Sequence, residues 1–159
     1  AVLFACNSDP RFVIKGKVSG SDSVTFLLQK REAGKIVTLD SAVVQKGSFK
    51  MTGKVEYPEL VQLVALNTPY RTSFYIENSE ITVTGKLDSL FNAKVTGSKT
   101  QDEYNSLIEA TKPLSEKYSA MVQEYQSARQ VNDTAKMSQI EKAADEISKQ
   151  MSTTQKEFI

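Results

Sequence analysis

The side chains that most enzymes use for acid–base and nucleophilic chemistry are scarce in this sequence. The 159 residues include no histidine and a single cysteine, Cys6. Without histidine the commonest general base near neutral pH is missing, and Ser-His-Asp and Cys-His catalysis are excluded within the chain. One cysteine cannot form a C-x-x-C redox pair, and zinc loses its usual ligands. We therefore expect no catalytic residue, no metal site and no cofactor here.

Carboxylates and tyrosines are the chemical groups that remain. The cluster of Glu141, Asp145 and Glu146 lies in a predicted helix, where a solvated polar face explains it better than a catalytic acid and base. An enzyme that uses carboxylates alone, as glycosidases do, is the least favoured hypothesis because nothing places two of them in a protected cleft. A helical stripe of tyrosines (Tyr104, Tyr118, Tyr125) favours core packing, with the hydroxyls at its edge, over a ligand-stacking face.

The candidate binding surface consists of residues in or near predicted loops. These residues are Tyr57, Tyr70, Arg71 and Tyr75. Loops carry binding functions on β-scaffolds more often than strands do. The alternative for Tyr75 is a cross-strand pair within a sheet.

The first ten residues resemble the end of a lipoprotein signal peptide. The run LFAC at residues 3–6 is apolar up to a small residue before cysteine, and the polar run NSDP follows it directly. In this interpretation the peptide is cleaved after Ala5 and Cys6 carries the lipid, with the rest of the signal lying upstream. An acylated cysteine carries more than one chain, which is sufficient for a stable anchor. The alternative is an incidental free cysteine. We expect a membrane-anchored protein of the bacterial cell envelope, facing the periplasm or the surface.

Residues 11–98 are predicted to form seven or eight short strands. Apolar and polar residues alternate, as in Phe12, Ile14 and Val18, and turn signals such as Lys46-Gly47 recur between the strands. The nearly apolar run at 60–66 suits a central strand, and 74–76 with 81–85 is predicted to be a hairpin. Because no helical pattern interrupts this region, an antiparallel sandwich or open barrel is expected and parallel βαβ units are not.

Residues 99–159 are predicted to form two amphipathic helices that pair as an antiparallel hairpin, giving an α+β fold. Thr100 with Glu103 forms a capping-box pattern, Pro113 should kink or split the first helix, and Asn132-Asp133 should cap the second. The second helix carries a heptad-like seam consisting of Met137, Ile140, Ala144, Ile147, Met151, Thr154 and Phe158. The seams could pack on each other, on the sandwich or on a second chain, so a homodimer is one expectation.

Four runs together resemble a known domain. They are FVIKGKV at 12–18, DSAVV with GSF at 40–49, FYIEN with ITVTG at 74–85, and KVTGSKTQDEY at 94–104. Their order and spacing resemble the uncharacterised β-rich N-terminal domain of the TlpA/ResA-like, AhpC/TSA-type thiol-disulfide oxidoreductase lipoproteins of Bacteroidetes. The resemblance implies that a thioredoxin-like domain follows the helices, and it transfers no catalytic residue to this chain.

The sequence thus predicts a tether over residues 1–10, a sandwich domain over 11–98 and a two-helix appendage over 99–159. The function it favours is a non-catalytic accessory domain that spaces, dimerises or provides substrate recognition for an envelope oxidoreductase. The alternative is a self-standing ligand-binding lipoprotein. The formal net charge of +1 gives no indication of nucleic-acid binding.

Overall fold

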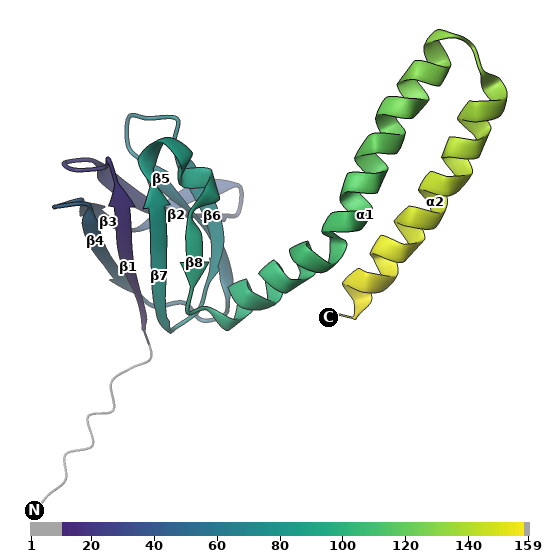
Figure 1. Ribbon diagram of the computed structural model, residues 1–159. Coiled ribbons are helices and arrows are strands. Elements are labelled where there is room, and N and C mark those ends of the chain that lie inside the picture. Colours follow the sequence, from purple (N-terminus) through teal and green to yellow (C-terminus); the bar gives the residue numbers. More distant parts are fainter. Residues whose placement is uncertain (1–10, 158–159) are drawn as a thin grey trace, which may run out of the picture. The chain divides into compact units, whose positions relative to one another are not determined.

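The computed structural model describes residues 11–157, in which eight strands precede two long helices (Figure 1). The strands are β1 (Phe12–Ser19), β2 (Thr25–Glu32), β3 (Lys35–Val43), β4 (Ser48–Gly53), β5 (Glu59–Ala65), β6 (Arg71–Ile76), β7 (Glu80–Lys86) and β8 (Lys94–Thr96). A 3-10 helix, η1 (Leu87–Asn92), precedes β8, and the helices are α1 (Lys99–Gln130) and α2 (Thr134–Lys156). The chain divides into two compact units, one ending at Asp102 and the other beginning at Glu103.

The strands form two four-stranded sheets that enclose one core. Sheet A has the order β4-β1-β7-β8, and sheet B has the order β3-β2-β5-β6. The inward-facing residues of both sheets join a single apolar cluster, in which the rings of Phe26 and Phe49 lie 4.9 Å apart. The predicted α+β class is confirmed. The sandwich follows from the period-two patterning, which gives each strand one apolar face to bury.

Strand connectivity differs from the prediction where neighbouring strands in the sequence fall in different sheets. The predicted hairpin of residues 74–76 with 81–85 is wrong, because β6 is the edge of sheet B whereas β7 lies inside sheet A. Strand β7 pairs with β1 in parallel, the only parallel pair among the described strands. Parallel neighbours need a long crossover, which the intervening strands of sheet B help to supply. Local patterning does not encode such a distant pairing.

Hydrogen bonds connect the two sheets near the point where β3 leads into β4. The turn predicted at Lys46 and Gly47 is present, with both residues at positive φ and a single bridge between Gln45 and Ser48, but the strands on either side of it belong to different sheets. The carboxylate of Asp40 accepts hydrogen bonds from the backbone N–H of Ser41 at 2.8 Å and from that of Thr52 at 2.8 Å. One side chain therefore satisfies donors on β3 of sheet B and on β4 of sheet A.

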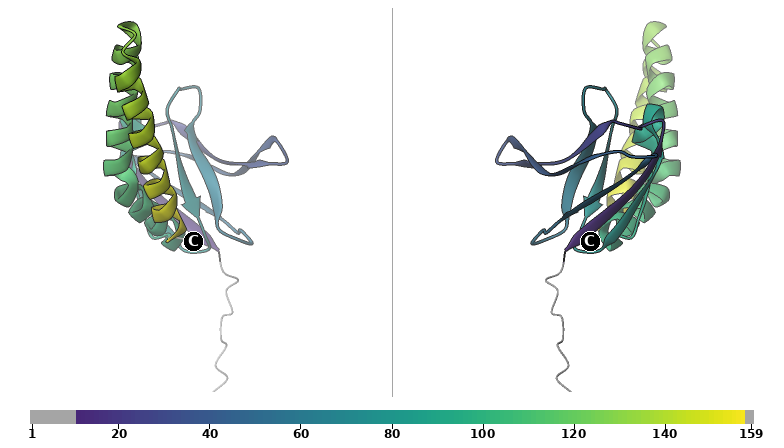
Figure 2. Two further views of the ribbon diagram at one scale, coloured as in Figure 1. Left: turned by 90° about the vertical axis from the view of Figure 1, so that its right-hand side faces the viewer. Right: turned by 90° about the vertical axis from the view of Figure 1, so that its left-hand side faces the viewer.

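The hairpin of β2 and β3 extends beyond the rest of the sandwich (Figure 2). Its register shifts between Leu28 and Gln29, which marks a bulge, and only residues 26–29 of β2 pair with β5. Bulges increase twist and bend a strand. The tip of the hairpin, where Arg31 pairs with the exposed Ile36, is consequently free of the sheet.

Helix α1 begins on the sandwich, and its cap differs from the one predicted. The Ser98 hydroxyl accepts from the N–H of Gln101 at 3.2 Å, and the helix starts at Lys99. Thr100, the predicted cap, therefore lies inside the first turn, where its hydroxyl donates to Glu77 at 3.4 Å. The capping-box pattern located the helix start within two residues but selected the wrong hydroxyl.

Pro113 lies inside α1 without splitting it. The helix is continuous through Pro113, and its ribbon bends along its course (Figure 1). Proline lacks the N–H that would bond the carbonyl four residues earlier. The nearby Thr111 hydroxyl donates to the carbonyls of Leu107 at 2.8 Å and Ile108 at 3.3 Å, a contact that often accompanies bends.

Helix α2 pairs with α1 through its predicted seam. Asp133 caps α2 as predicted, accepting from the N–H of Lys136. The described seam residues are all buried or half-buried, with Ile140 and Ile147 the most enclosed. Tyr125 on α1 donates to Glu141 at 3.0 Å, and Lys136 pairs with Glu124 at 2.7 Å. The seam is thus covered within the chain, so it supplies no argument for a dimer, and Phe158 lies outside the described residues.

Candidate functional site

The outer face of sheet B carries a hollow at the base of the projecting hairpin. Its volume is about 170 Å³, and it is lined by Gln29, Lys30, Arg31, Ile36, Leu60, Val61, Gln62 and Ser73. A second hollow of about 400 Å³ at the same place shares Lys30, Arg31 and Leu60 and adds Glu32 and Glu59. The protruding hairpin forms one wall, and strand β5 forms the floor.

Register explains why these side chains gather. Gln29 of β2 lies opposite Thr38 of β3 and opposite Gln62 of β5, which in turn faces Ser73 of β6. Residues opposite one another share a face of the sheet, so amides and hydroxyls form a row across the outer surface. Leu60, which is 54% exposed, forms an apolar step beside this row. Such a surface offers hydrogen bonds and apolar contact but no activated nucleophile.

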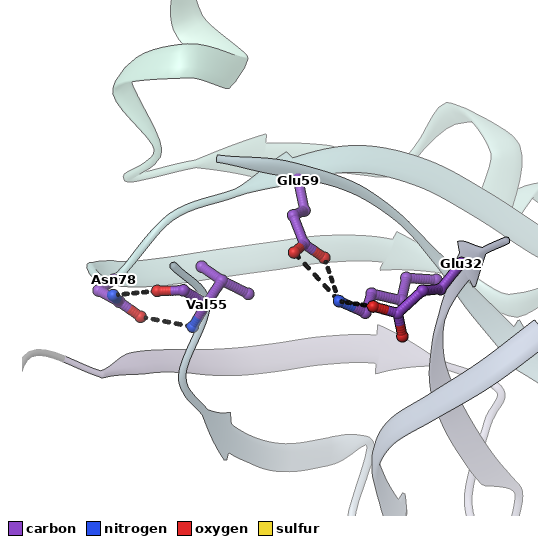
Figure 3. A network of polar contacts seen from close by, with 5 residues as sticks. Glu32, Val55, Glu59 and Asn78 are labelled. Carbon is purple, nitrogen blue, oxygen red and sulfur yellow. Dashed lines mark hydrogen bonds and ion pairs between the residues drawn. The ribbon is translucent and has the colours of Figure 1, made fainter. Parts of the chain in front are cut away.

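Lys30 is held by carboxylates beneath the hollow (Figure 3). Its ammonium group lies 3.0 Å from one oxygen of Glu59 and 3.1 Å from the other, with Glu32 at 3.8 Å. The hydrogen bond to Glu59 is the main cause that raises the pKa of Lys30 above its usual value, despite partial desolvation. Lys30 therefore forms a charged contact that links the hairpin to β5 through Glu59.

The loop that carries Tyr57 is fixed by Asn78. The N–H of Val55 donates to the Asn78 side chain at 3.0 Å, and the Asn78 amide donates back to the Val55 carbonyl at 2.7 Å (Figure 3). This reciprocal pair replaces a strand ladder where β4 has ended. Tyr57 projects from the loop and is 70% exposed.

The four predicted surface residues are not brought together. Arg71 and Tyr75 lie within β6 and not in a loop, and Tyr75 faces Leu60 across the strands, as the alternative for it anticipated. Tyr70 packs partly against the core and lines a different hollow of about 330 Å³ with Lys86 and Asp88. Tyr57 precedes β5 and Tyr70 precedes β6; because these strands are antiparallel, the two tyrosines lie at opposite ends of the hairpin.

A compact polar joint fixes the first turn of α1 on the sandwich. Gln101, only 6% exposed, accepts a hydrogen bond from the backbone N–H of Tyr75 at 2.7 Å. The fully buried Ser98 caps the turn, and the Glu77 carboxylate accepts from the N–H of Lys99. A carboxylate at a helix N-terminus also complements the helix dipole. We call Tyr75, Glu77, Ser98, Lys99 and Gln101 the joint.

One known protein family matches the part of the chain that contains the strands and the joint. Its profile, described as "Domain of unknown function (DUF4369)", matches residues 12–104. The chain belongs to the DUF4369 family. None of the curated proteins compared with the chain matches it. The DUF4369 match begins at the first residue of β1 and ends within the first turns of α1, so the joint is part of the family's domain.

Two further features of the DUF4369 chain concern metal ligands and membrane-spanning helices. Within residues 11–157, no three His, Cys, Asp or Glu side chains are grouped as metal ligands. Among the helices that the structure describes, none is long and apolar enough to cross a bilayer. Cys6, the predicted lipidation site, lies outside the described residues.

Sequence reasoning missed the hollow and the joint. The hollow depends on the register of four strands and on a bulge, neither of which a single strand's pattern reveals. The joint had a partial signal, because Ser98 is followed by a polar helix start. What could not be foreseen is that Gln101 turns inward to the edge of β6.

Proposed function

We propose that this chain is a non-catalytic accessory domain of a thiol-disulfide oxidoreductase lipoprotein of the bacterial cell envelope. The sandwich serves as a mount that spaces or orients a thioredoxin-like domain and assists its choice of substrate proteins. Membership of the DUF4369 family agrees with the domain type. The sequence supports the lack of redox chemistry, because one cysteine and no histidine cannot make a dithiol centre.

The joint is the observation that carries this proposal. A domain that positions a following domain needs a firm attachment for the segment that connects the two. Here that segment is α1, so its first turn should be fixed on the sandwich. At the first turn of α1, the side chains of Gln101, Ser98 and Glu77 accept hydrogen bonds from backbone N–H groups, and Gln101 and Ser98 are themselves buried. Polar contacts of this kind hold the first turn, which belongs to the same compact unit as the strands, because breaking them leaves desolvated groups unpaired.

Two measurements test the proposal directly. The protein extracted from its native membranes should have about twice the mass of this chain, plus acyl chains on Cys6, as one further domain of ordinary size would give. The 159-residue chain alone should not reduce insulin. A native mass near 17.6 kDa without lipid, or insulin reduction by this chain, would overturn the proposal.

The role of the joint is tested in the full native protein. Gln101→Ala should slow reduction of a protein disulfide while leaving reduction of a small disulfide unchanged, because only the former depends on how the domains are presented. Gln126→Ala, at an exposed position of α1, is the matched control. Equal rates for both variants with the protein substrate would show that the joint does not guide the catalytic domain.

The hollow on sheet B favours a second candidate, a ligand-binding lipoprotein. Arg31, Gln62 and Ser73 could bind a peptide or glycan through hydrogen bonds, with Leu60 providing apolar contact. NMR titration with peptide and oligosaccharide libraries should then shift resonances of these residues. Shifts confined to other surfaces, or none, would remove this candidate.

A further inference from the structure

The outer face of sheet A is strongly basic, and nothing described above uses it. Alternation along β1, β4, β7 and β8 directs one set of side chains outward. Five of them are exposed lysines: Lys15, Lys17, Lys50, Lys86 and Lys94. We call these five residues the lysine face.

Register places these cations next to one another. Lys15 of β1 lies directly opposite Lys50 of β4, and Lys17 lies opposite Thr84, which faces Lys94. Like charges directly opposite one another destabilise a sheet. An anionic surface bound across the face would offset that repulsion.

Few acidic groups neutralise this surface. Glu80 shares the face and pairs with Lys15 at 2.7 Å, while both side chains remain mostly exposed. Asp22 lies beyond the end of the strands and accepts from the N–H of Gly47. Between the lysines the outward residues are mainly hydroxyls such as Thr82, Thr84 and Thr96, and the half-buried Val13 is the apolar residue of β1 on this side, so the face is suited to lie against headgroups.

We propose that the lysine face docks the domain onto an anionic phospholipid bilayer. Charge complementarity is the first argument, because the surface potential of anionic lipids attracts clustered lysines. The second argument rests on the lipid tether of the proposed function. Cys6 is six positions before Phe12, the first residue of β1, and an extended chain of that length spans at most about 20 Å. A lipid on Cys6 would keep β1, a central strand of the lysine face, close to the membrane.

The test uses the 159-residue chain without acylation and two kinds of vesicle. Co-sedimentation should occur with vesicles containing phosphatidylglycerol, weaken as salt is raised, and be absent with pure phosphatidylcholine. Substituting Lys17, Lys50, Lys86 and Lys94 by Gln should lower the association constant by on the order of a hundred-fold or more, since each lysine near a charged bilayer contributes about five-fold.

A matched variant controls for net charge. Substituting Lys117, Lys142, Lys149 and Lys156 by Gln removes the same charge from exposed positions of α1 and α2 and should lower the association constant only a few-fold. Equal losses in the two variants, or no binding to the anionic vesicles, would overturn the proposal. Binding to duplex DNA as tight as to vesicles, lost in the first variant alone, would make the face a nucleic-acid surface and would also overturn it.

Acetylation footprinting of the unaltered chain removes any dependence on how the variants fold. Anionic vesicles should protect Lys17, Lys50 and Lys94 from the reagent and leave Lys142 and Lys149 reactive; the reverse pattern would contradict the assignment. These outcomes are separate from those for the proposed function. The native protein could prove to be lipidated and to carry a second domain while this chain does not bind anionic vesicles. That result would support the proposed function and contradict membrane docking by the lysine face.

Discussion

Single residues decide where strands can approach one another in this domain, and Gly97 is the glycine that lies closest to another stretch of backbone. It has φ of +93°, and a Cβ placed there would lie 2.1 Å from the carbonyl oxygen of Glu80. Gly34 also has positive φ, at +80°, but a Cβ there meets nothing within 4 Å. A side chain at Gly34 would meet only the backbone strain of positive φ, whereas one at Gly97 would meet that strain and a steric clash as well.

We expect Gly97→Ala to be far more destabilising than Gly34→Ala. Positive φ costs alanine about 1 kcal/mol at either site. At Gly97 the start of β7 must also move, so the total loss should reach about 3 kcal/mol or more. Urea unfolding of both variants measures the difference, and similar losses would show that the approach of residue 97 to Glu80 is not tight in solution.

At the scale of elements, pairing is specified partly by pattern and partly by distant contacts. The seam of α2 was readable because every third or fourth residue is apolar, and Asp133 was readable as a cap. On α1 the pattern was less reliable: Tyr125 is half-buried, whereas Tyr104 and Tyr118 are each 42% exposed. The sequence marked one broad apolar stripe, and pairing with α2 covers only part of it.

The contribution of the seam is tested at Ile147. This side chain is 3% exposed, whereas Ile108 on α1 is 48% exposed. Ile147→Ala should cost about 2–4 kcal/mol, because it removes methyl groups and leaves a cavity, and Ile108→Ala should cost less than half of that. Hydrogen exchange of the helix amides measures both, and equal effects would indicate that α2 does not use this seam.

The contact between Tyr125 and Glu141 predicts a pH effect. The hydrogen bond to Glu141 is the main cause that raises the pKa of the Tyr125 phenol above its usual value. The neutral phenol is the donor, so this contact stabilises the helix pair at pH below the phenol's unfolded pKa and is lost as pH rises through the raised value. Carbon-13 NMR titration should show the Tyr125 pKa falling in Glu141→Ala and unchanged in Glu146→Ala; no change in either would contradict the contact.

At the scale of the whole molecule, fold class, strand number and helix pairing followed from periodicity, because each strand or helix must bury one apolar face. The parallel β1–β7 pair and the sheet membership of β6 did not, because partners so far apart in sequence are selected by the complete core. The same limit applied to the hollow: Arg31, Gln62 and Ser73 come from three strands.

Two compact units predict separable folding. A chain of residues 11–104, which covers the sandwich and the whole joint, should fold alone, since the described core cluster comes entirely from residues 12–95. Its amide NMR spectrum should overlay that of the full chain except near the new C-terminus. A collapsed, poorly dispersed spectrum would show that the helices are needed to complete the sandwich.

The parallel β1–β7 pair has a consequence for the order in which the chain acquires structure. Val13 and Glu80 are register partners 67 positions apart, whereas β2 with β3 and β5 with β6 are neighbours in sequence. Closing a long loop costs more entropy than closing a short one, and non-local pairing slows folding. Sheet B can therefore assemble on a growing chain, whereas β1 can pair with β4 on one side but gains its second neighbour only when β7 has been made. Until then the second edge of β1 has no ladder and the core that its apolar residues join is incomplete, so a chaperone could bind both.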